Sequence, residues 1–479
     1  MADGPLEIVV CGGGLAGFSA GIAALESGAS VTLIEKAPEV GGTTIISGGL
    51  VWTIAEYERI RSDIPDGDPS LQWLVHDTID TARDWLAAKG ARLGPDEPLL
   101  GHGRGRIMDP AQAIGVLHDA FLAAGGRLHV STALDTLLMQ DGVVCGVRAV
   151  RDGVPVDFHA DAVILATGGF QGNAELLARY VVPDPDNLIL RANPWSTGDA
   201  FLAATAIGAA VSPGLDTFYG HALTMAPARY SKLEFRDVSQ YYGQSGVAIN
   251  LRGERFCDEA EGNGEELLNQ HLARQPGGKG FYIIDQNALV SAPIQGLEVV
   301  TSAIIDRARR AGAPIVEAQS LEDLCAALGA FGVSSAIALE TLLGFNAQLE
   351  NGSADRLKPC RRTRRTPLHR APFYAVGVQA AITFTMGGLQ VDERMRVLRR
   401  TGSTSTMAPP PAERAFAQTG QDGIAIGTDY RQNVVRGLYA AGCDAGNISH
   451  FGYMGGLASA LTTGLAAGRH AAGTAGLQA

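Results

Sequence analysis

A run of glycines near the start of the chain constrains the fold more than any other feature. Residues 12–17 read Gly-Gly-Gly-Leu-Ala-Gly and fit the spacing GxGxxG. The apolar run 6–11 before them predicts a buried parallel strand, and the alanine-rich stretch 15–27 predicts a helix. A second apolar run, 31–35, predicts the next strand. This order of strand, glycines, helix and strand predicts a βαβ unit that binds a dinucleotide.

Each glycine of this motif has its own physical reason. Gly12 makes the tight turn from strand to helix, Gly14 lets backbone amides approach a pyrophosphate, and Gly17 lets the helix pack closely on the strand. The helix N-terminus, with Leu15 and Ala16, then presents unpaired N–H groups and a positive dipole end to the phosphates. In the alternative interpretation the glycines serve packing only.

The end of the second predicted strand indicates which dinucleotide binds. Glu35 lies where a carboxylate accepts hydrogen bonds from ribose hydroxyls, and an acidic residue there disfavours a cofactor with a 2′-phosphate. The segment 41–44 (Gly-Gly-Thr-Thr), just beyond, favours FAD over NAD. The alternative is that Glu35 is an ordinary surface residue at the end of a strand.

The composition sets broad limits on the class of protein. Of 479 residues, 46% are hydrophobic and 18% are charged, which excludes a disordered chain. The net charge of −12 argues against nucleic-acid binding. The six cysteines are scattered without a CxxC pair, so neither a metal site nor a redox motif is predicted. No signal peptide and no membrane span are visible, and we therefore expect a cytoplasmic protein.

The pattern of predicted elements divides the chain into three segments. The composition becomes more polar over residues 216–371, so we expect an inserted domain there, within a larger domain formed by residues 1–215 and 372–479. An antiparallel hairpin is predicted with its turn at Asp141-Gly142. The basic run 361–365 is interpreted as a solvated loop, and the Ser/Thr/Pro-rich segment 401–432 as a loop without an assigned role.

The sequence resembles the FAD-binding family of fumarate reductases and succinate dehydrogenase flavoproteins, which also includes the 3-ketosteroid dehydrogenases. Segments that carry this resemblance occur in family order over nearly the whole chain. They are the GxGxxG opening, Glu35-Lys36, Gly41-Gly42-Thr43, Ser47-Gly48-Gly49, the run Val163–Phe170, Thr197-Gly198-Asp199, Gly253–Phe256, Thr385–Leu389 and Gly437–Gly442.

The resemblance implies an α/β fold with a split Rossmann-type FAD-binding domain and an inserted α+β cap domain. FAD is expected to be noncovalent, because segment 43–49 lacks the histidine of covalent family members. The implied FAD contacts are Gly12, Gly14, Leu15, Ala16, Gly17, Glu35, Lys36, Gly41, Gly42, Thr43, Thr44, Ser47, Gly48, Gly49, Ala166, Thr167, Gly168, Asp199, Gly442, Gly455, Gly456 and Leu457. An alternative for Asp199 is an N-cap of the following helix.

The family moves a hydride between the flavin and a carbon next to an activated carbon, while a protein group handles the proton. This sequence departs from fumarate reductases at the positions that hold a dicarboxylate. Phe384 replaces a carboxylate-binding histidine, and Tyr453 replaces an arginine before the C-terminal glycines. The position of the proton-donor arginine falls near Leu289. Because unpaired carboxylates are costly to bury, fumarate and succinate are disfavoured.

Tyr453 is similar to the tyrosine with which ketosteroid dehydrogenases donate a hydrogen bond to the substrate ketone. Phe384 would suit an apolar ring, and Thr385 and Ser449 are further candidate substrate contacts. The alternative for Tyr453 is a buried tyrosine that bonds the backbone.

The group that moves the proton is less defined by the sequence. The family's second tyrosine, a base, would fall near Asn263, which cannot act as a base. Tyr219, Tyr241 or Tyr242 could substitute for it. His450, in the same turn as Tyr453, is a further candidate for the proton relay, with a structural histidine as the alternative.

We therefore predict an FAD-dependent CH–CH oxidoreductase that dehydrogenates a cyclic or apolar small-molecule carbonyl compound, or reduces the corresponding enone. The electron acceptor and the oligomeric state are not indicated. One alternative is a fumarate reductase-like enoate or dicarboxylate reductase that uses Arg104, Arg106 or Arg229. Another is a non-catalytic flavin-binding or electron-transfer subunit.

Overall fold

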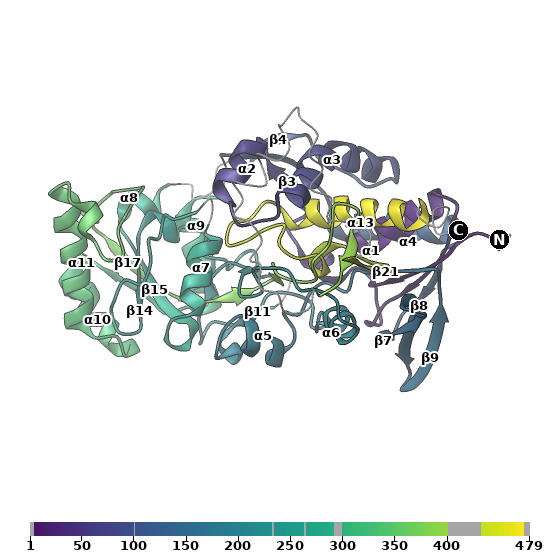
Figure 1. Cartoon of the computed structure of the whole chain (residues 1–479). Coiled ribbons are helices and arrows are strands. Elements are labelled where there is room, and N and C mark those ends of the chain that lie inside the picture. Colours follow the sequence, from purple (N-terminus) through teal and green to yellow (C-terminus); the bar gives the residue numbers. More distant parts are fainter. Residues whose placement is uncertain are drawn as a thin grey trace, which may run out of the picture.

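The computed structural model describes residues 4–99, 101–231, 234–262, 265–291, 299–400 and 433–473. The segment 401–432 and Asn263 lie outside these ranges. In Figure 1 the chain forms two lobes, one with both the purple N-terminal and the yellow C-terminal helices, the other built from the teal and green middle of the chain. We propose that this middle segment is the insertion that the sequence predicts.

The lobe that contains both ends of the chain is built on a six-stranded sheet with the order β20-β21-β10-β1-β2-β6. Its strands are β1 (Glu7–Cys11), β2 (Ser30–Ile34), β6 (Arg127–His129), β10 (Ala162–Leu165), β20 (Arg396–Leu398) and β21 (Val434–Ala440). Strands β6, β2, β1, β10 and β21 run parallel to their neighbours, and β20 is antiparallel to β21. The central strands are buried on both faces, which explains their continuous apolar sequences.

Helix α1 (Leu15–Glu26) connects β1 to β2 and confirms the predicted βαβ unit. The C-terminal helix α13 (Gly456–Gly473) packs against α1. A side chain at Gly464 would meet the Ala16 carbonyl oxygen at 2.5 Å, and one at Gly468 would meet that of Ala20 at 2.2 Å. Glycine at these two positions thus lets the first and last helices of the domain pack backbone to backbone.

Two smaller antiparallel sheets and further helices complete this lobe. The sheets are β3 (Leu50–Ile54), β5 (Gly103–Ile107) and β4 (Glu97–Leu99), and β7 (Thr132–Gln140), β8 (Val143–Arg151) and β9 (Val154–His159). The helices are α2 (Tyr57–Asp63), α3 (Pro69–Ala88), α4 (Pro110–Ala123), α5 (Ala174–Tyr180) and α6 (Asp199–Ala206). The β7–β8 pair confirms the predicted hairpin, with Asp141 at φ 50° and Gly142 at φ 74° in its turn.

The inserted lobe contains a five-stranded sheet. Its strands are β13 (Leu223–Thr224), β14 (Val247–Asn250), β15 (Lys279–Ile284), β16 (Ile315–Ala318) and β17 (Phe373–Gln379). Its helices are α7 (Glu266–Ala273), α8 (Gln286–Leu289), α9 (Thr301–Ala311), α10 (Leu321–Leu328) and α11 (Ser335–Glu350). Strand β17 pairs with β15 along its whole length, so it belongs to the cap sheet although the sequence placed it after the boundary at residue 372. We therefore propose a second boundary near residue 380.

Two short strand pairs join the segments that flank the insertion. Strand β11 (Ile189–Leu190) pairs in parallel with β18 (Ala381–Ile382). Strand β12 (Phe218–Tyr219) pairs antiparallel with β19 (Phe384–Thr385), with Tyr219 opposite Phe384. These pairs bring cap residues next to the C-terminal part of the FAD-binding domain.

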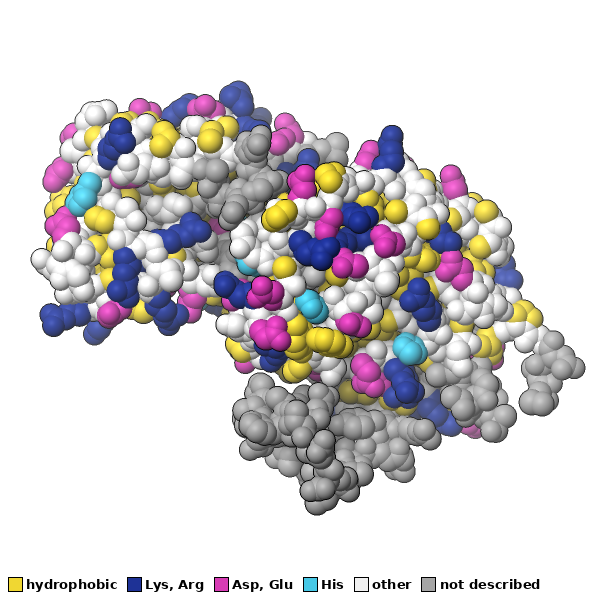
Figure 2. All heavy atoms as spheres, turned by 90° about the horizontal axis from the view of Figure 1, so that it is seen from above, with side chains coloured by type: hydrophobic (Ala, Val, Ile, Leu, Met, Phe, Trp, Pro, Cys, Tyr) yellow, Lys and Arg dark blue, Asp and Glu magenta, His cyan; other side chains and the backbone are white. Residues whose placement is uncertain are grey.

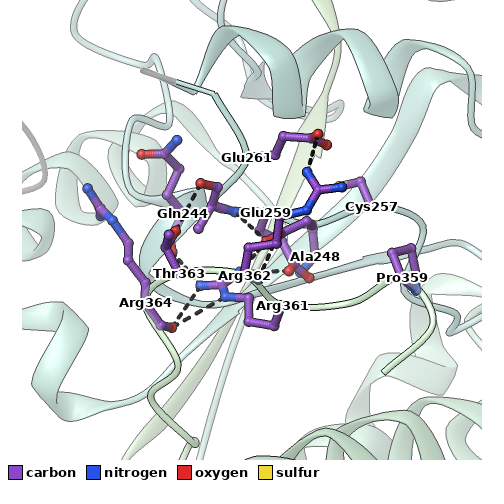
Figure 3. Close-up of polar contacts among 12 residues, drawn as sticks. Gln244, Ala248, Cys257, Glu259, Glu261, Pro359, Arg361, Arg362, Thr363 and Arg364 are labelled. Atoms are coloured by element: carbon purple, nitrogen blue, oxygen red, sulfur yellow. Dashed lines mark hydrogen bonds and ion pairs between the residues drawn. The ribbon is translucent and has the colours of Figure 1, made fainter. Parts of the chain in front are cut away.

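A buried ion-pair network fixes two loops of the cap (Figure 3). Arg361 Nη1 lies 2.7 Å from Glu259 Oε2, and Arg255 donates to both oxygens of the same carboxylate at 2.8 Å. Arg361 Nη2 also donates to the Gln244 carbonyl oxygen at 2.7 Å. Glu259 is fully buried and Arg361 is 1% exposed, so the interpretation of this basic run as solvated is wrong for Arg361. Its charge is instead satisfied inside the cap.

The surface carries charges of both signs. Figure 2 shows Lys and Arg interspersed with Asp and Glu on one face of the molecule, without a large area of one sign. Across the part of the chain that the structure describes, no helix combines the length and the apolar character needed to span a bilayer.

Candidate active site

Residues of both lobes line a cavity of about 720 Å³, a volume within the range of ligand pockets. The predicted FAD contacts in its wall are Gly12, Gly14, Leu15, Ala16, Glu35, Lys36, Gly42, Thr43, Thr44, Ser47, Gly48, Ala166, Thr167, Gly168, Asp199, Gly442, Gly456 and Leu457. Gly17, Gly41, Gly49 and Gly455 lie outside the wall. The segments that carry the family resemblance thus meet around one space.

The glycines of the first turn have the geometry that a dinucleotide needs. Gly12 has φ +115°, and a Cβ there would lie 2.1 Å from the Ala166 carbonyl oxygen. A Cβ at Gly17 would lie 1.8 Å from the Gly12 oxygen, so Gly17 serves helix packing. Gly14, the N-cap of α1, makes no side-chain cap bond and faces the cavity. The start of α1 therefore fits a pyrophosphate.

Glu35 is buried beside this turn. Its Oε2 accepts the Gly13 N–H at 2.6 Å and its Oε1 accepts the Ala37 N–H at 2.7 Å. Burial raises the pKa of this carboxyl, although the backbone hydrogen bonds act in the opposite direction. The carboxylate therefore fixes the glycine turn, and it lines the cavity where a ribose would bind.

Lys36 and Asp199 form an ion pair of 3.0 Å in the same wall. Asp199 is the first residue of α6, whose N-cap is Gly198 at φ 85° without a side-chain cap bond. The alternative that Asp199 caps this helix is therefore wrong. Its side chain is oriented by Lys36 and by Thr197, whose Oγ1 donates to it at 2.7 Å.

Another part of the wall is aromatic. The ring of Tyr453 stacks on that of Tyr219, with centroids 3.9 Å apart and planes at 22°. The ring of Phe384 also stacks on that of Tyr219, with centroids 5.0 Å apart. Trp52 meets Tyr453 edge-on, with centroids 5.6 Å apart. All four side chains line the cavity. The predicted site residues Tyr453 and Phe384 are thus brought together, with Tyr219 between them.

Tyr453 presents its hydroxyl beside a backbone donor. The Gly456 N–H, at the first residue of α13, donates to Tyr453 Oη at 2.8 Å. Burial raises the pKa of Tyr453 above its ordinary value. The hydroxyl therefore keeps its proton at neutral pH and can donate it to an acceptor.

A chain of polar side chains from the cap continues from Tyr219. Tyr219 Oη lies 3.0 Å from His221 Nε2, and His221 Nδ1 lies 3.0 Å from Glu265 Oε2. Tyr282 donates its hydroxyl to Glu265 Oε1 at 2.6 Å. Tyr219, His221 and Glu265 line the cavity. The sequence did not indicate any of these three contacts.

Arg191 is a cavity residue that the sequence did not indicate. It is 9% exposed, its Nη1 donates to Thr383 Oγ1 at 2.8 Å, and its Nε has no hydrogen-bond partner among the described residues. The arginines named for a carboxylate clamp, Arg104, Arg106 and Arg229, are not in the cavity wall. Arg104 is instead paired with Asp96 at the surface.

Several predicted substrate residues lie elsewhere. His450 is outside the cavity wall, where its Nδ1 lies 2.8 Å from Asn447 Oδ1. Ser449 accepts the Met454 N–H at 3.4 Å, and Thr385 is buried next to the Phe170 N–H at 3.5 Å. These contacts stabilise the backbone around the site, and neither Ser449 nor Thr385 lines the cavity.

The structure also separates the three candidate tyrosines. Tyr219 and Tyr241 line the cavity. Tyr242 is fully buried outside the wall and donates its hydroxyl to Gln240 Oε1 at 2.8 Å. Tyr242 is thereby excluded from contact with a substrate in this cavity.

The parallel sheet, the glycine turn and the capped cavity define a dinucleotide-binding α/β protein with a separate substrate lobe. More specifically, the chain belongs to the FAD binding domain family, whose model matches residues 98–406. A second model, FAD dependent oxidoreductase, matches residues 7–179. Together they cover the glycine turn and the cap.

Relatives of known activity agree with this assignment. The chain is 28% identical over 460 residues to urocanate reductase of Eggerthella lenta, covering 88% of this chain and 71% of the relative. It is 25% identical over 500 residues to fumarate reductase (cytochrome) of Shewanella frigidimarina, covering 98% and 77%. Its fold is similar to that of 3-ketosteroid Δ1-dehydrogenase from Sterolibacterium denitrificans, with a TM-score of 0.70 and 19% identity over 98% of this chain and 100% of that one.

These findings confirm the predicted family, the α/β fold class and the cofactor FAD. The protein is an FAD-dependent oxidoreductase that acts on CH–CH groups, in a family whose members act on C=C bonds. The alternative of a non-catalytic flavin-binding subunit is thereby disfavoured.

Proposed function

We propose that this enzyme forms or reduces a C=C bond conjugated to a carbonyl group in a ring-shaped or otherwise apolar small molecule. The observation that carries this proposal is the pair formed by the Tyr453 hydroxyl and the Gly456 N–H, 2.8 Å apart in the cavity wall. The Gly456 N–H donates to Tyr453 Oη, and the hydroxyl proton can be donated to a substrate carbonyl oxygen, where it stabilises the negative charge that develops.

The surrounding side chains favour a flat, apolar substrate. Trp52, Tyr219 and Phe384 surround Tyr453 with ring faces and edges. Aromatic walls of this kind bind planar molecules through their large apolar area. FAD, when bound, supplies the hydride chemistry at the substrate's β-carbon. We propose that the glycine turn and the predicted FAD contacts that line the cavity hold this cofactor noncovalently.

We assign the proton at the α-carbon to Tyr219. Of the three tyrosines that the sequence left open, its ring stacks on Tyr453 and its hydroxyl contacts His221 at 3.0 Å. Burial holds the pKa of Tyr219 well above its ordinary value, so the hydroxyl gives up its proton only when another group replaces it. His450 is not included in this proposal because Asn447 holds it outside the cavity.

A second candidate function, reduction of an α,β-unsaturated carboxylate, is favoured by Arg191. A buried arginine with an unpartnered Nε can pair with a carboxylate of the substrate. The nearby carboxyls of Glu265 and Glu266 are poor ion-pair partners for Arg191. Burial raises the pKa of each of them and so favours the neutral form.

A substrate panel with matched variants separates these functions. Photoreduced enzyme is mixed anaerobically with 2-cyclohexenone, a Δ1-3-ketosteroid, cinnamate and fumarate, and reoxidation of the flavin is followed by absorbance. The enones are expected to react in the parent and in Arg191→Gln, and to slow in Tyr453→Phe. Reaction of the acids alone, abolished in Arg191→Gln, would instead establish the second function.

Two further properties belong to this proposal. Acid precipitation is expected to release all flavin into the supernatant, as noncovalent binding requires. Cell fractionation tests the proposed cytoplasmic location. The electron acceptor is left unassigned.

A further inference from the structure

Three polar side chains of the cap, the half-buried Tyr219 and the buried His221 and Glu265, form a continuous path that ends at the cavity. The contacts run from Tyr219 Oη to His221 Nε2 at 3.0 Å and from His221 Nδ1 to Glu265 Oε2 at 3.0 Å. They connect β12, the segment between β12 and β13, and the residue that precedes α7. The backbone of β12 is held by its pairing with β19, so the first member of the path has a fixed position.

Burying a chain of polar side chains costs free energy unless their hydrogen bonds are satisfied. Buried polar groups in a low-dielectric environment need all their hydrogen bonds, and a chain of them strengthens each bond. Here the far end is also satisfied, because Tyr282 on β15 donates to Glu265 Oε1 at 2.6 Å. Each nitrogen of the imidazole therefore meets an oxygen, which is the arrangement that moves a proton through a histidine ring.

The surroundings set the protonation states along the path. Burial, together with the charge of Arg191, holds the pKa of His221 well below its ordinary value. Burial raises the pKa of Glu265 well above its ordinary value, and the neighbouring Glu266 acts in the same direction. The ground state is thus a neutral imidazole next to a carboxyl that keeps its proton.

Two more groups face the imidazole. Glu266 Oε1 lies 3.8 Å from His221 Nε2, beyond hydrogen-bond distance, and the Tyr241 ring meets the imidazole edge-on at 4.8 Å. Neither forms a link between Tyr219 and Glu265. Among the described residues, the path thus consists of Tyr219, His221 and Glu265. Glu261, whose carboxylate pairs with Arg362 Nη1 at 2.6 Å outside the cavity wall, offers a control of the same residue type.

We propose that His221 and Glu265 form a proton relay behind Tyr219, in which the Glu265 carboxyl is the store of the proton that the reaction transfers to the α-carbon. This inference rests on the proposed function, in which Tyr219 is the acid or base. His221 and Glu265 act through Tyr219 and are positioning and relay residues.

In the reducing direction the proton relay forms three bonds to hydrogen and breaks three. The Tyr219 O–H breaks as its proton joins the substrate's α-carbon, the His221 Nε2–H proton moves to Tyr219, and the Glu265 O–H proton moves to Nδ1. The electron pair for the new α C–H bond comes from the C=C bond, and the hydride for its β-carbon is what FAD would supply when bound. Glu265 is left as a carboxylate, stabilised by the Tyr282 hydroxyl and by the positive charge of Arg191. Dehydrogenation is the reverse.

Hydrogen exchange tests this relay without hydride transfer. Dithionite-reduced holoenzyme is incubated in D₂O with cyclohexanone or a saturated 3-ketosteroid, and deuterium at the α-carbon is measured by mass spectrometry. Glu265→Gln keeps hydrogen-bonding groups at this position but can neither take up nor give back the transferred proton, so exchange is expected to slow about 10²-fold. His221→Gln is expected to slow exchange equally, and the double variant no further, since the residues act as one unit.

Two measurements make the test independent of folding and of catalysis. Glu261→Gln, the matched control, is expected to exchange within about threefold of the parent, because its carboxylate pairs with Arg362 outside the cavity wall. Infrared spectra of the parent at neutral pH are expected to contain the band of a protonated carboxyl that is absent in Glu265→Gln. This readout needs no substrate.

The possible outcomes separate the relay from the proposed function. If Tyr219→Phe abolishes exchange while His221→Gln and Glu265→Gln do not, the relay is wrong and the role of Tyr219 stands. An infrared spectrum without the Glu265 band also refutes the relay. If no ketone of the panel reacts with the parent, the proposed function fails, and the infrared result alone then decides whether Glu265 stores a proton.

Discussion

Replacing Tyr453 by phenylalanine removes one oxygen atom from the cavity wall and keeps the ring. The stack on Tyr219, with centroids 3.9 Å apart, and the edge contact with Trp52 at 5.6 Å do not involve the hydroxyl. The substitution removes the acceptor of the 2.8 Å bond from the Gly456 N–H. The substitution therefore tests the donor to the substrate carbonyl with little change in packing.

The magnitude follows from the loss of one donor. If the Tyr453 hydroxyl donates to the substrate carbonyl oxygen, the variant lacks that donor. Loss of one such donor lowers turnover by about 10²–10³, equivalent to about 2.7–4 kcal/mol of transition-state stabilisation. The binding of FAD should be unchanged.

The assay is the rate of flavin reoxidation by 2-cyclohexenone in a stopped-flow spectrometer, with the flavin spectrum as a measure of cofactor content. Tyr242→Phe is the matched control, because this hydroxyl contacts Gln240 outside the cavity. We expect the control to react at the parent's rate. A Tyr453→Phe variant that also retains the parent's rate would refute the assignment of Tyr453 as the carbonyl donor.

Two further predictions concern stability. Arg361→Met removes one arginine from buried Glu259 while Arg255 remains, so we expect a loss below the about 3–5 kcal/mol of a fully broken buried pair. It is measured as a fall in thermal midpoint that the exposed control Arg362→Met does not show. Burial raises the pKa of Glu266 to about 7, so between its ordinary pKa and this value the folded protein holds a proton that the unfolded chain releases. Stability should therefore fall as pH rises through this range, and Glu266→Gln should flatten the slope; parallel slopes would contradict it.

Local motifs predicted much of the fold and of the FAD site. The turn at Gly12 and the packing role of Gly17 depend on backbone geometry over a few residues, which the spacing of glycines encodes directly. Tyr453 and Phe384 were found because each lies next to a recognisable glycine segment. Strand β17 pairs in the cap sheet, so we propose a second boundary near residue 380 instead of the predicted one at residue 371. The apolar sequence of this strand would fit either sheet, so the sequence alone does not assign it.

The polar residues of the cavity were not predictable in this way. Arg191, His221 and Glu265 belong to segments without a motif, and only the folding of the cap brings them together. His450 illustrates the opposite error. It is three residues from Tyr453, yet the backbone turns between them, with Phe451 at φ 56°, and directs the imidazole to Asn447. Proximity in sequence does not fix the direction of a side chain in such a turn.

The arrangement of the central sheet has a consequence for the order of folding. Strand β1 lies between β2 and β10, and β10 also pairs with β21 near the end of the chain. Thr167 and Asp444, whose side chains are hydrogen-bonded beside the cavity, are separated by 277 positions. Contacts of such high sequence separation form late and slowly. The nascent chain therefore passes most of its synthesis without a complete nucleotide site, and FAD can stabilise only molecules that have nearly finished folding.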